Sequence, residues 1–133
     1  MSAVVDSSLL VAATVDAGPE GAWAEELVGA GNLVAPDLAL VEATNILRRL
    51  ELAGRLEKLE ATAAARDLLG LDLQVVPYAP FADRVWELRH NLTSYDAWYV
   101  AAAEELDLPL ATVDRRLADS TGPRCRFLLP PEL

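Results

Sequence analysis

The first apolar run of the chain is Ser2-Ala3-Val4-Val5, and Asp6 ends it at once. A second run, Leu110-Ala111-Thr112-Val113, is ended in the same way by Asp114. Short apolar runs of this kind are typical of strands buried on both faces of a parallel sheet. Parallel strands finish at a common edge, where α/β folds build their sites. We therefore expect both aspartates at the carboxyl edge of one sheet.

Helical patterns separate the strand-like runs, and Gly and Pro residues punctuate the chain between them. The expected strands cover residues 3–5, 33–35, 73–76, 110–113 and 127–128, and the expected helices cover residues 7–13, 20–29, 38–52, 56–69, 80–89, 95–106 and 115–118. Parallel neighbours need crossovers, and helices placed between strands supply them. The sequence predicts one α/β domain over residues 1–133, with a mainly parallel central sheet of four to five strands covered by helices.

Two further carboxylates lie on predicted helices. Glu42 is on helix 38–52 and shares a face with Asn45, three positions on, while Asp96 follows an expected N-cap at Ser94 by two places. Taken singly, each acid of the set has an ordinary role, because aspartates cap helices and acidic side chains favour first helical turns. Gathered beside buried strands, however, they would repel one another unless a cation neutralised them. Hard carboxylate oxygens suit Mg2+, with Mn2+ as the alternative.

Composition places the chain among globular domains. It has 133 residues, of which 53% are hydrophobic, enough for one domain with a proper core. The formal net charge is −10, so the surface as a whole should repel nucleic acid, and a basic protein partner is a natural explanation for the acidity. No apolar run approaches the roughly 18 residues of a membrane span, and a secretory signal pattern is lacking. We expect a cytoplasmic protein with no membrane partner.

The ordered set of motifs is more specific than any one of them, and it resembles the PIN-domain ribonuclease toxins of the VapC type. The matching segments are Val4-Val5-Asp6-Ser7-Ser8, Ala35-Pro36-Asp37-Leu38-Ala39-Leu40-Val41-Glu42-Ala43-Thr44-Asn45, Thr93-Ser94-Tyr95-Asp96-Ala97 and Ala111-Thr112-Val113-Asp114-Arg115-Arg116-Leu117. The resemblance covers nearly the whole chain. It implies a PIN-like nuclease domain and a Mg2+-dependent endoribonuclease, the toxin of a toxin and antitoxin pair, usually a homodimer.

The resemblance also assigns an acidic catalytic pocket to four positions, namely Asp6, Glu42, Asp96 and Asp114. Asn45 and Thr112 fit as partners that support those carboxylates. We expect Asp6 and Asp96 to hold the metal directly, while Asp114 and Glu42 bind through water or a second ion. Water at the site would then attack an RNA phosphodiester, with Glu42 the candidate to orient it.

Two arginines follow the last carboxylate of the set. Arg115 and Arg116 could bind the scissile or a flanking phosphate of the RNA substrate, although both could equally be solvated helix residues. In the family that the chain resembles, a cognate antitoxin silences the toxin and often presents arginine to the acidic pocket. A strongly negative surface would attract such a partner.

Two other functions stay open. Receiver-like and dehalogenase-like phosphoryl-transfer domains also place carboxylates at strand ends, but the dehalogenase pattern needs a second Asp where this chain has Ser8. Both classes also need a late lysine, and Lys58 lies in a polar segment far from any strand end. The third possibility is a catalytically silent PIN-like module that only binds a partner.

Aromatic residues are the other candidates for RNA contact, because bases stack on exposed rings. Helical spacing among apolar neighbours predicts that Trp86 and Trp98 belong to the core. Tyr95 and Tyr99 are four positions apart and share a helix face, which leaves their exposure open.

Overall fold

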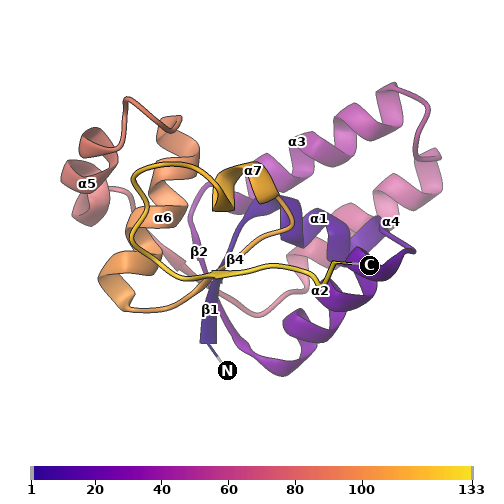
Figure 1. The fold of residues 1–133 in the computed structure, drawn as a ribbon. Coiled ribbons are helices and arrows are strands. Elements are labelled where there is room, and N and C mark those ends of the chain that lie inside the picture. The colour runs from indigo at the N-terminus through magenta and orange to yellow at the C-terminus, as the bar shows by residue number, and fades with distance from the viewer. Residues whose placement is uncertain (1, 133) are drawn as a thin grey trace.

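Five parallel strands form the centre of the computed structural model, which describes residues 2–132 (Figure 1). The strands are β1 (Ser2–Val5), β2 (Asn32–Pro36), β3 (Leu73–Val76), β4 (Leu110–Ala111) and β5 (Phe127–Leu128). They lie in the order β3-β2-β1-β4-β5, and every neighbouring pair is parallel. The predicted α/β fold with a mainly parallel sheet is confirmed.

Helices cover the sheet on two sides. They are α1 (Ser7–Val15), α2 (Pro19–Ala30), α3 (Ala39–Leu52), α4 (Lys58–Leu69), the 3-10 turn η1 (Ala79–Phe81), α5 (Ala82–Glu87), α6 (Ser94–Leu106) and α7 (Arg115–Ala118). Figure 1 shows α1 to α4 on one side of the strands and α5 with α6 on the other. Helix α6 packs on β1, β2 and β4, while α1 contacts α2, α3 and α4.

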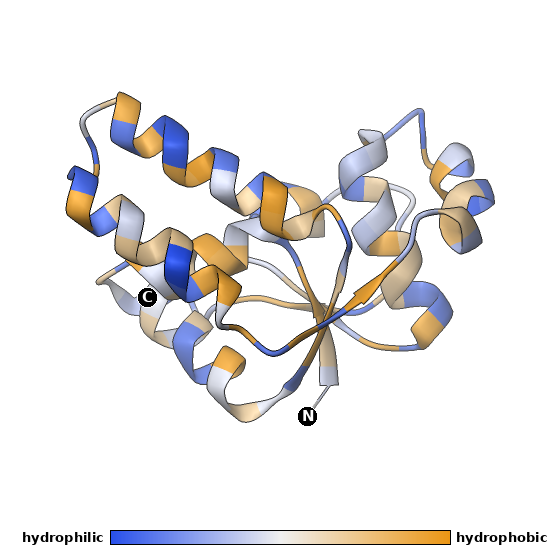
Figure 2. Cartoon of the chain, turned by 180° about the vertical axis from the view of Figure 1, so that it is seen from behind, coloured by the Kyte–Doolittle hydropathy of each residue, from blue (hydrophilic) through white to orange (hydrophobic). Residues whose placement is uncertain are grey.

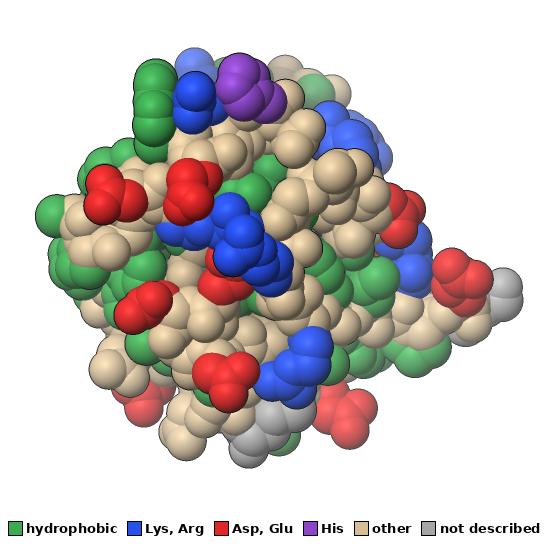
Figure 3. Space-filling model, turned by 60° about the vertical axis from the view of Figure 1, so that its left-hand side comes forward, with side chains coloured by type: hydrophobic (Ala, Val, Ile, Leu, Met, Phe, Trp, Pro, Cys, Tyr) green, Lys and Arg blue, Asp and Glu red, His purple; other side chains and the backbone are tan. Residues whose placement is uncertain are grey.

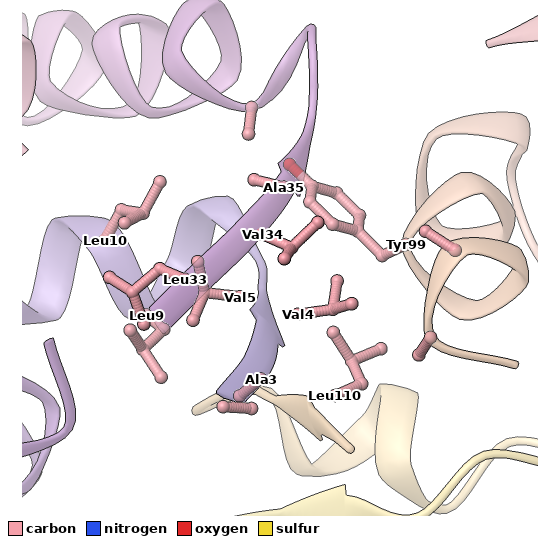
Figure 4. Packing of buried hydrophobic residues seen from close by; sticks show 14 of the residues in the cluster. Ala3, Val4, Val5, Leu9, Leu10, Leu33, Val34, Ala35, Tyr99 and Leu110 are labelled. Carbon is pink, nitrogen blue, oxygen red and sulfur yellow. The ribbon is translucent and has the colours of Figure 1, made fainter. Parts of the chain in front are cut away.

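The core lies on both faces of the central strand β1. Ala3, Val4 and Val5 are buried because helices cover each face, so the strand has no polar side. Figure 2 shows hydrophobic residues along the central strands and a mixture on the outer helices. On the α6 side the buried residues include a run of small side chains, Ala101-Ala102-Ala103, which lets this helix approach the sheet closely. Figure 4 shows Val4, Val34 and Leu110 between the sheet and α6.

The register of the strands brings the first residues of several helices to one edge of the sheet. Val5 is the register partner of Ala111, so the residues that follow each strand emerge side by side. Asp6 is the N-cap of α1, and Asp114 is the N-cap of α7. Helices α3 and α6 carry Glu42 and Asp96 in their first turns. All four predicted acids therefore stand at helix starts, and the ordinary capping role holds for the two N-caps.

Several local boundaries differ from the prediction. The N-cap of α6 is Thr93 rather than Ser94, because the Thr93 backbone is extended and its hydroxyl accepts the N–H of Asp96 at 3.2 Å. The predicted helix 80–89 begins as the 3-10 turn η1. Between α3 and α4 the chain turns at Gly54, whose φ of 75° favours glycine. No helix within residues 2–132 has the length and hydrophobicity to cross a membrane.

The division of the aromatic residues into buried and exposed side chains differs from the prediction. Trp98 is buried as expected, but Trp86 is 66% exposed, so its assignment to the core was wrong. The short helix α5 presents Trp86 outward, and the guanidinium carbon of Arg89 lies 4.3 Å from its ring centroid. Tyr95 is 56% exposed and Tyr99 only 2%, because Tyr95 lies in the first turn of α6 and Tyr99 lies where that helix covers the sheet.

Candidate active site

Asp6 is the most deeply buried carboxylate of the four. Its Oδ1 accepts the N–H of Leu9 at 3.0 Å and the hydroxyl of Ser8 at 2.7 Å, and its Oδ2 accepts the hydroxyl of Thr112 at 2.5 Å. Burial raises the pKa of Asp6 to about 6, although these hydrogen bonds oppose the shift, and nearby Asp114 adds to it. The carboxylate is thus held in one orientation at an electrostatic cost.

Thr112 joins the ends of β1 and β4. Besides its bond to Asp6, the Thr112 hydroxyl accepts the backbone N–H of Asp114 at 2.9 Å. The Ser8 hydroxyl lies 3.2 Å from it. Asp114 uses Oδ1 to cap α7, accepting the N–H of Arg116 at 3.0 Å. Because that bond and its helix fix the carboxylate, Oδ2 is the Asp114 oxygen left for other partners.

Glu42 reaches the edge from α3 and is held by a tyrosine. The hydroxyl of Tyr99 on α6 donates to Oε1 of Glu42 at 2.5 Å. Burial raises the pKa of Glu42, the Tyr99 hydrogen bond opposes that shift, and the negative charge of Asp96 reinforces it. In turn, burial and the Glu42 carboxylate raise the pKa of the Tyr99 hydroxyl. The tyrosine therefore stays a neutral donor.

Asp96 completes the acidic group. Burial raises the pKa of Asp96, and so does the charge of Asp114, whereas Arg116 and the Thr93 hydroxyl lower it. Asp96 also lines a shallow hollow of about 170 Å³ with Asn91, Thr93 and Arg116. Larger hollows lie elsewhere. One of about 460 Å³ is lined by Arg84, Glu104 and Cys125, but none of the four acidic residues lines it.

The four carboxylates influence one another in pairs. The charge of Asp114 raises the pKa of both Asp6 and Asp96, and the charge of Asp96 raises the pKa of Glu42. Within residues 2–132, no three acidic, His or Cys side chains converge closely enough to enclose a metal ion. The donor set nevertheless suits a hard divalent cation, since it consists of carboxylate oxygens, and burial together with the charge of a neighbouring carboxylate raises the pKa of Asp6, Glu42 and Asp96. The site is an open acidic edge rather than a closed cage.

The supporting residues of the prediction occupy different places. Thr112 contacts the acidic residues, but Asn45 is exposed, and its side chain makes no hydrogen bond to them within the described part of the chain. Arg116 lies beside Asp114, with 3.8 Å between its Nη2 and Oδ2. Arg115 instead donates to the carbonyl of Pro130 at 2.6 Å, so it is engaged with the C-terminal segment. Only Arg116 borders the hollow of Asp96.

Two residues of the site were not assigned to it from the sequence. Ser8 was noted only as the residue that replaces a second aspartate, yet its hydroxyl bonds to Asp6. Tyr99 was considered for base stacking, yet its ring is buried and its hydroxyl meets Glu42. The position of Ser8 two residues after a helix-capping Asp is a local signal for such a bond. No local signal links Tyr99 to Glu42, because these residues are 57 positions apart.

The family model described as "PIN domain" matches residues 3–122, which include the whole of the acidic edge. The VapC ribonuclease Mb0985 of Mycobacterium bovis is 36% identical over 128 residues, covering 96% of this chain and 98% of that protein. Ribonuclease VapC1 of Mycobacterium tuberculosis is 37% identical over 127 residues, covering 95% and 96%. The chain belongs to the PIN-domain family, among the VapC-type ribonuclease toxins.

Solved structures support the same fold. The crystal structure of VapBC2 from Rickettsia felis, bound to a DNA fragment from its promoter, superposes with a TM-score of 0.68 at 14% identity, covering 97% of this chain and 98% of that one. Membership of the PIN family excludes the receiver-like and dehalogenase-like alternatives. It also makes the chain an endoribonuclease by class, as the resemblance implied.

Proposed function

We propose that this chain is a Mg2+-dependent endoribonuclease that hydrolyses RNA phosphodiester bonds at Asp6, Glu42, Asp96 and Asp114. The observation that supports the proposal is that each of these carboxylates is close enough to another of the four for one charge to raise the pKa of the other, although they come from four separate elements. Burial and mutual repulsion raise the pKa of three of them. A divalent cation removes that repulsion, so the arrangement favours metal binding.

In this proposal Asp6 and Asp96 hold the ion directly, and Asp114 contributes its Oδ2 through water. Because no three acidic, His or Cys side chains of residues 2–132 converge closely enough to enclose an ion, water would fill the remaining positions, as Mg2+ prefers. Mn2+ is the natural alternative. When bound, such an ion stabilises developing charge on the phosphate and makes water more acidic. Thr112 and Ser8 keep the Asp6 oxygens in place.

The remaining groups act on water and substrate. Glu42 is half-buried with Oε1 committed to Tyr99, so Oε2 is the oxygen that would orient the attacking water and accept its proton. Arg116 borders the hollow of Asp96 and would bind a phosphate oxygen of the RNA there. Arg115 is tied to the C-terminal segment, which makes it the weaker candidate for the same role.

The proposed partners are a cognate antitoxin and a second copy of this chain, with the cytoplasm as the proposed location. The Rickettsia felis structure is of VapBC2, and another similar structure, at 20% identity and a TM-score of 0.56, is described as a member of the VapBC family of toxin-antitoxin systems. A net charge of −10 favours a basic antitoxin segment over the acidic edge.

Cleavage of a mixed structured RNA pool tests the proposed activity. The purified chain is assayed with Mg2+, with Mn2+ and with chelator, alongside Asp6→Ala, Asp96→Ala and the exposed control Asp67→Ala of α4. Metal-dependent cuts that are lost in the first two variants and kept in the control are expected. Metal binding without cleavage of any RNA would favour the catalytically silent binding module instead.

A further inference from the structure

The ring of Tyr99 lies among apolar side chains, but its hydroxyl is polar. The tyrosine sits in the middle of α6, on the side that covers the sheet, and is 2% exposed. Figure 4 shows its ring over Val34 and its oxygen beside Ala35, toward the end of β2. A phenylalanine would fill that space without needing a partner, since a buried hydroxyl requires a hydrogen bond. The tyrosine oxygen therefore points to a role beyond packing.

The partner of this hydroxyl is the Glu42 carboxylate. The O–H donates to Oε1 at 2.5 Å, a length typical of charge-assisted bonds. The Ser7 hydroxyl is close enough to lower the pKa of Tyr99, so the tyrosine hydroxyl lies near the start of α1 as well as the first turn of α3. A buried ring cannot move freely, which makes the tyrosine a rigid support.

Glu42 needs such a support. It lies in the first turn of α3 and is only partly buried, so solvent reaches its side chain. The negative charge of Asp96 lies near enough to raise the pKa of Glu42. Without a fixed donor, repulsion from Asp96 and hydration would both draw the flexible Glu42 carboxylate away from the acidic edge.

We propose that Tyr99 is a positioning residue that holds Oε1 of Glu42 and so keeps Oε2 available at the acidic edge. The proposal rests on the proposed nuclease function of that edge. Tyr99 does not touch the substrate, and its whole effect on cleavage passes through Glu42. Fixing one oxygen before the RNA arrives removes a reorganisation step from the reaction, which is the benefit of preorganised groups.

Kinetics of Tyr99→Phe on an RNA that the parent protein cleaves provide the first test, with Tyr78→Phe as control. Tyr78 is a half-exposed tyrosine that packs edge-to-face on Trp98. We expect kcat of Tyr99→Phe to fall by about 10- to 100-fold, with KM for the RNA nearly unchanged, as for other groups that orient a functional side chain. The control should keep the parental kcat. Parental kcat in Tyr99→Phe would overturn the proposal.

A double-mutant cycle separates positioning from a general structural role. If Tyr99 acts through Glu42, Tyr99→Phe should cause no further loss of kcat when added to Glu42→Gln. An equal loss in both backgrounds would show that Tyr99 acts elsewhere. Thermal melts of each variant establish that it is folded before its rates are compared.

A measurement without RNA keeps the inference independent of the proposed function. Side-chain scalar couplings of Glu42, measured by NMR in the metal-free protein, report whether it occupies one rotamer. We expect one rotamer in the parent and averaged couplings in Tyr99→Phe. The same fixed rotamer in both proteins would overturn the role of Tyr99. A parent protein that cleaves no RNA would instead count against the nuclease function and leave this result valid.

Discussion

Thr112 donates its hydroxyl proton to Oδ2 of Asp6 over 2.5 Å, and so links two residues that are 106 positions apart. The same hydroxyl accepts the N–H of Asp114. One fully buried side chain therefore fixes both the carboxylate at the end of β1 and the backbone that presents the carboxylate after β4. This link explains how two separate strand ends form one acidic edge.

Replacing Thr112 with Val should damage both stability and cleavage. Valine has nearly the same shape but removes the donor to Asp6 and the acceptor for Asp114, at a cost of roughly 1–3 kcal/mol in the free energy of unfolding. Thr112→Ser keeps the hydroxyl and is the matched control. Urea unfolding and RNA cleavage rates measure the two effects. Equal cleavage rates in Thr112→Val and the parent would show that the link is not needed for activity.

Removing the charge of Asp6 should stabilise the metal-free protein while abolishing cleavage. The folded state raises the pKa of Asp6 from 3.8 to about 6, so between these values it binds more protons than the unfolded state. Stability is consequently lost as pH rises through that window, by about 3 kcal/mol above it. Asparagine keeps an acceptor oxygen for the Leu9 N–H and avoids this cost.

Thermal melts in chelator measure the effect. At pH 7.5 we expect Asp6→Asn to melt several degrees above the parent, and at pH 3.5 the difference should disappear because Asp6 is then protonated. Added Mg2+ or Mn2+ should raise the melting temperature of the parent more than that of the variant. A variant that melts below the parent at pH 7.5 would mean that the hydrogen bonds of Asp6 outweigh its charge burial.

Glu104 should support the fold at neutral pH and lose that role in acid. Its Oε1 accepts Nε of Arg84 at 2.7 Å, and its Oε2 accepts the N–H of Arg124 at 2.7 Å. Burial alone would raise the pKa of Glu104, but the bonds from Arg84 and Arg124 outweigh it and lower the pKa. The stabilisation is therefore present above the unfolded value of 4.5 and disappears as pH falls through the lower folded value.

Glu104→Gln should cost about 1–3 kcal/mol at pH 7, because a neutral amide replaces a half-buried charge-assisted pair. Its exposed neighbour Glu105→Gln is the control and should stay within about 0.5 kcal/mol of the parent. Denaturant unfolding at pH 7 and pH 3.5 measures the free energy of unfolding of the parent and of both variants. A Glu104→Gln penalty that persists undiminished at pH 3.5 would contradict the electrostatic origin.

Two glycines of α2 should respond to alanine in opposite ways. A Cβ at Gly21 would lie 1.8 Å from the carbonyl oxygen of Asp16, so the loop before the helix must move, at a cost of roughly 1–3 kcal/mol or more. A Cβ at Gly29 meets nothing within 4 Å, and there alanine should stabilise the helix by about 0.5–1 kcal/mol. Melting temperatures of the two variants should therefore fall on either side of the parental value.

The sequence by itself determined the order of strands and helices along the chain and the parallel sheet, and it marked the four carboxylates that we propose for the site. Buried parallel strands need continuous apolar runs, and the short runs 2–5 and 110–113, each followed by an aspartate, can be recognised from the sequence alone. The second strand is shorter than predicted, because β4 covers only Leu110–Ala111. The same pattern placed Asp6 and Asp114 at one edge, since parallel strands end together.

The tertiary structure alone decided which side chains meet across that edge. Periodicity defines a helix face but not the neighbour that covers it, which is why Trp86 is exposed and Tyr99 is buried against Glu42. Neighbouring arginines on one short helix point to different partners, so Arg116 borders the acidic hollow while Arg115 contacts the C-terminal segment. Contacts between residues far apart in the chain depend on how the helices and strands pack, and that packing cannot be predicted from the local sequence.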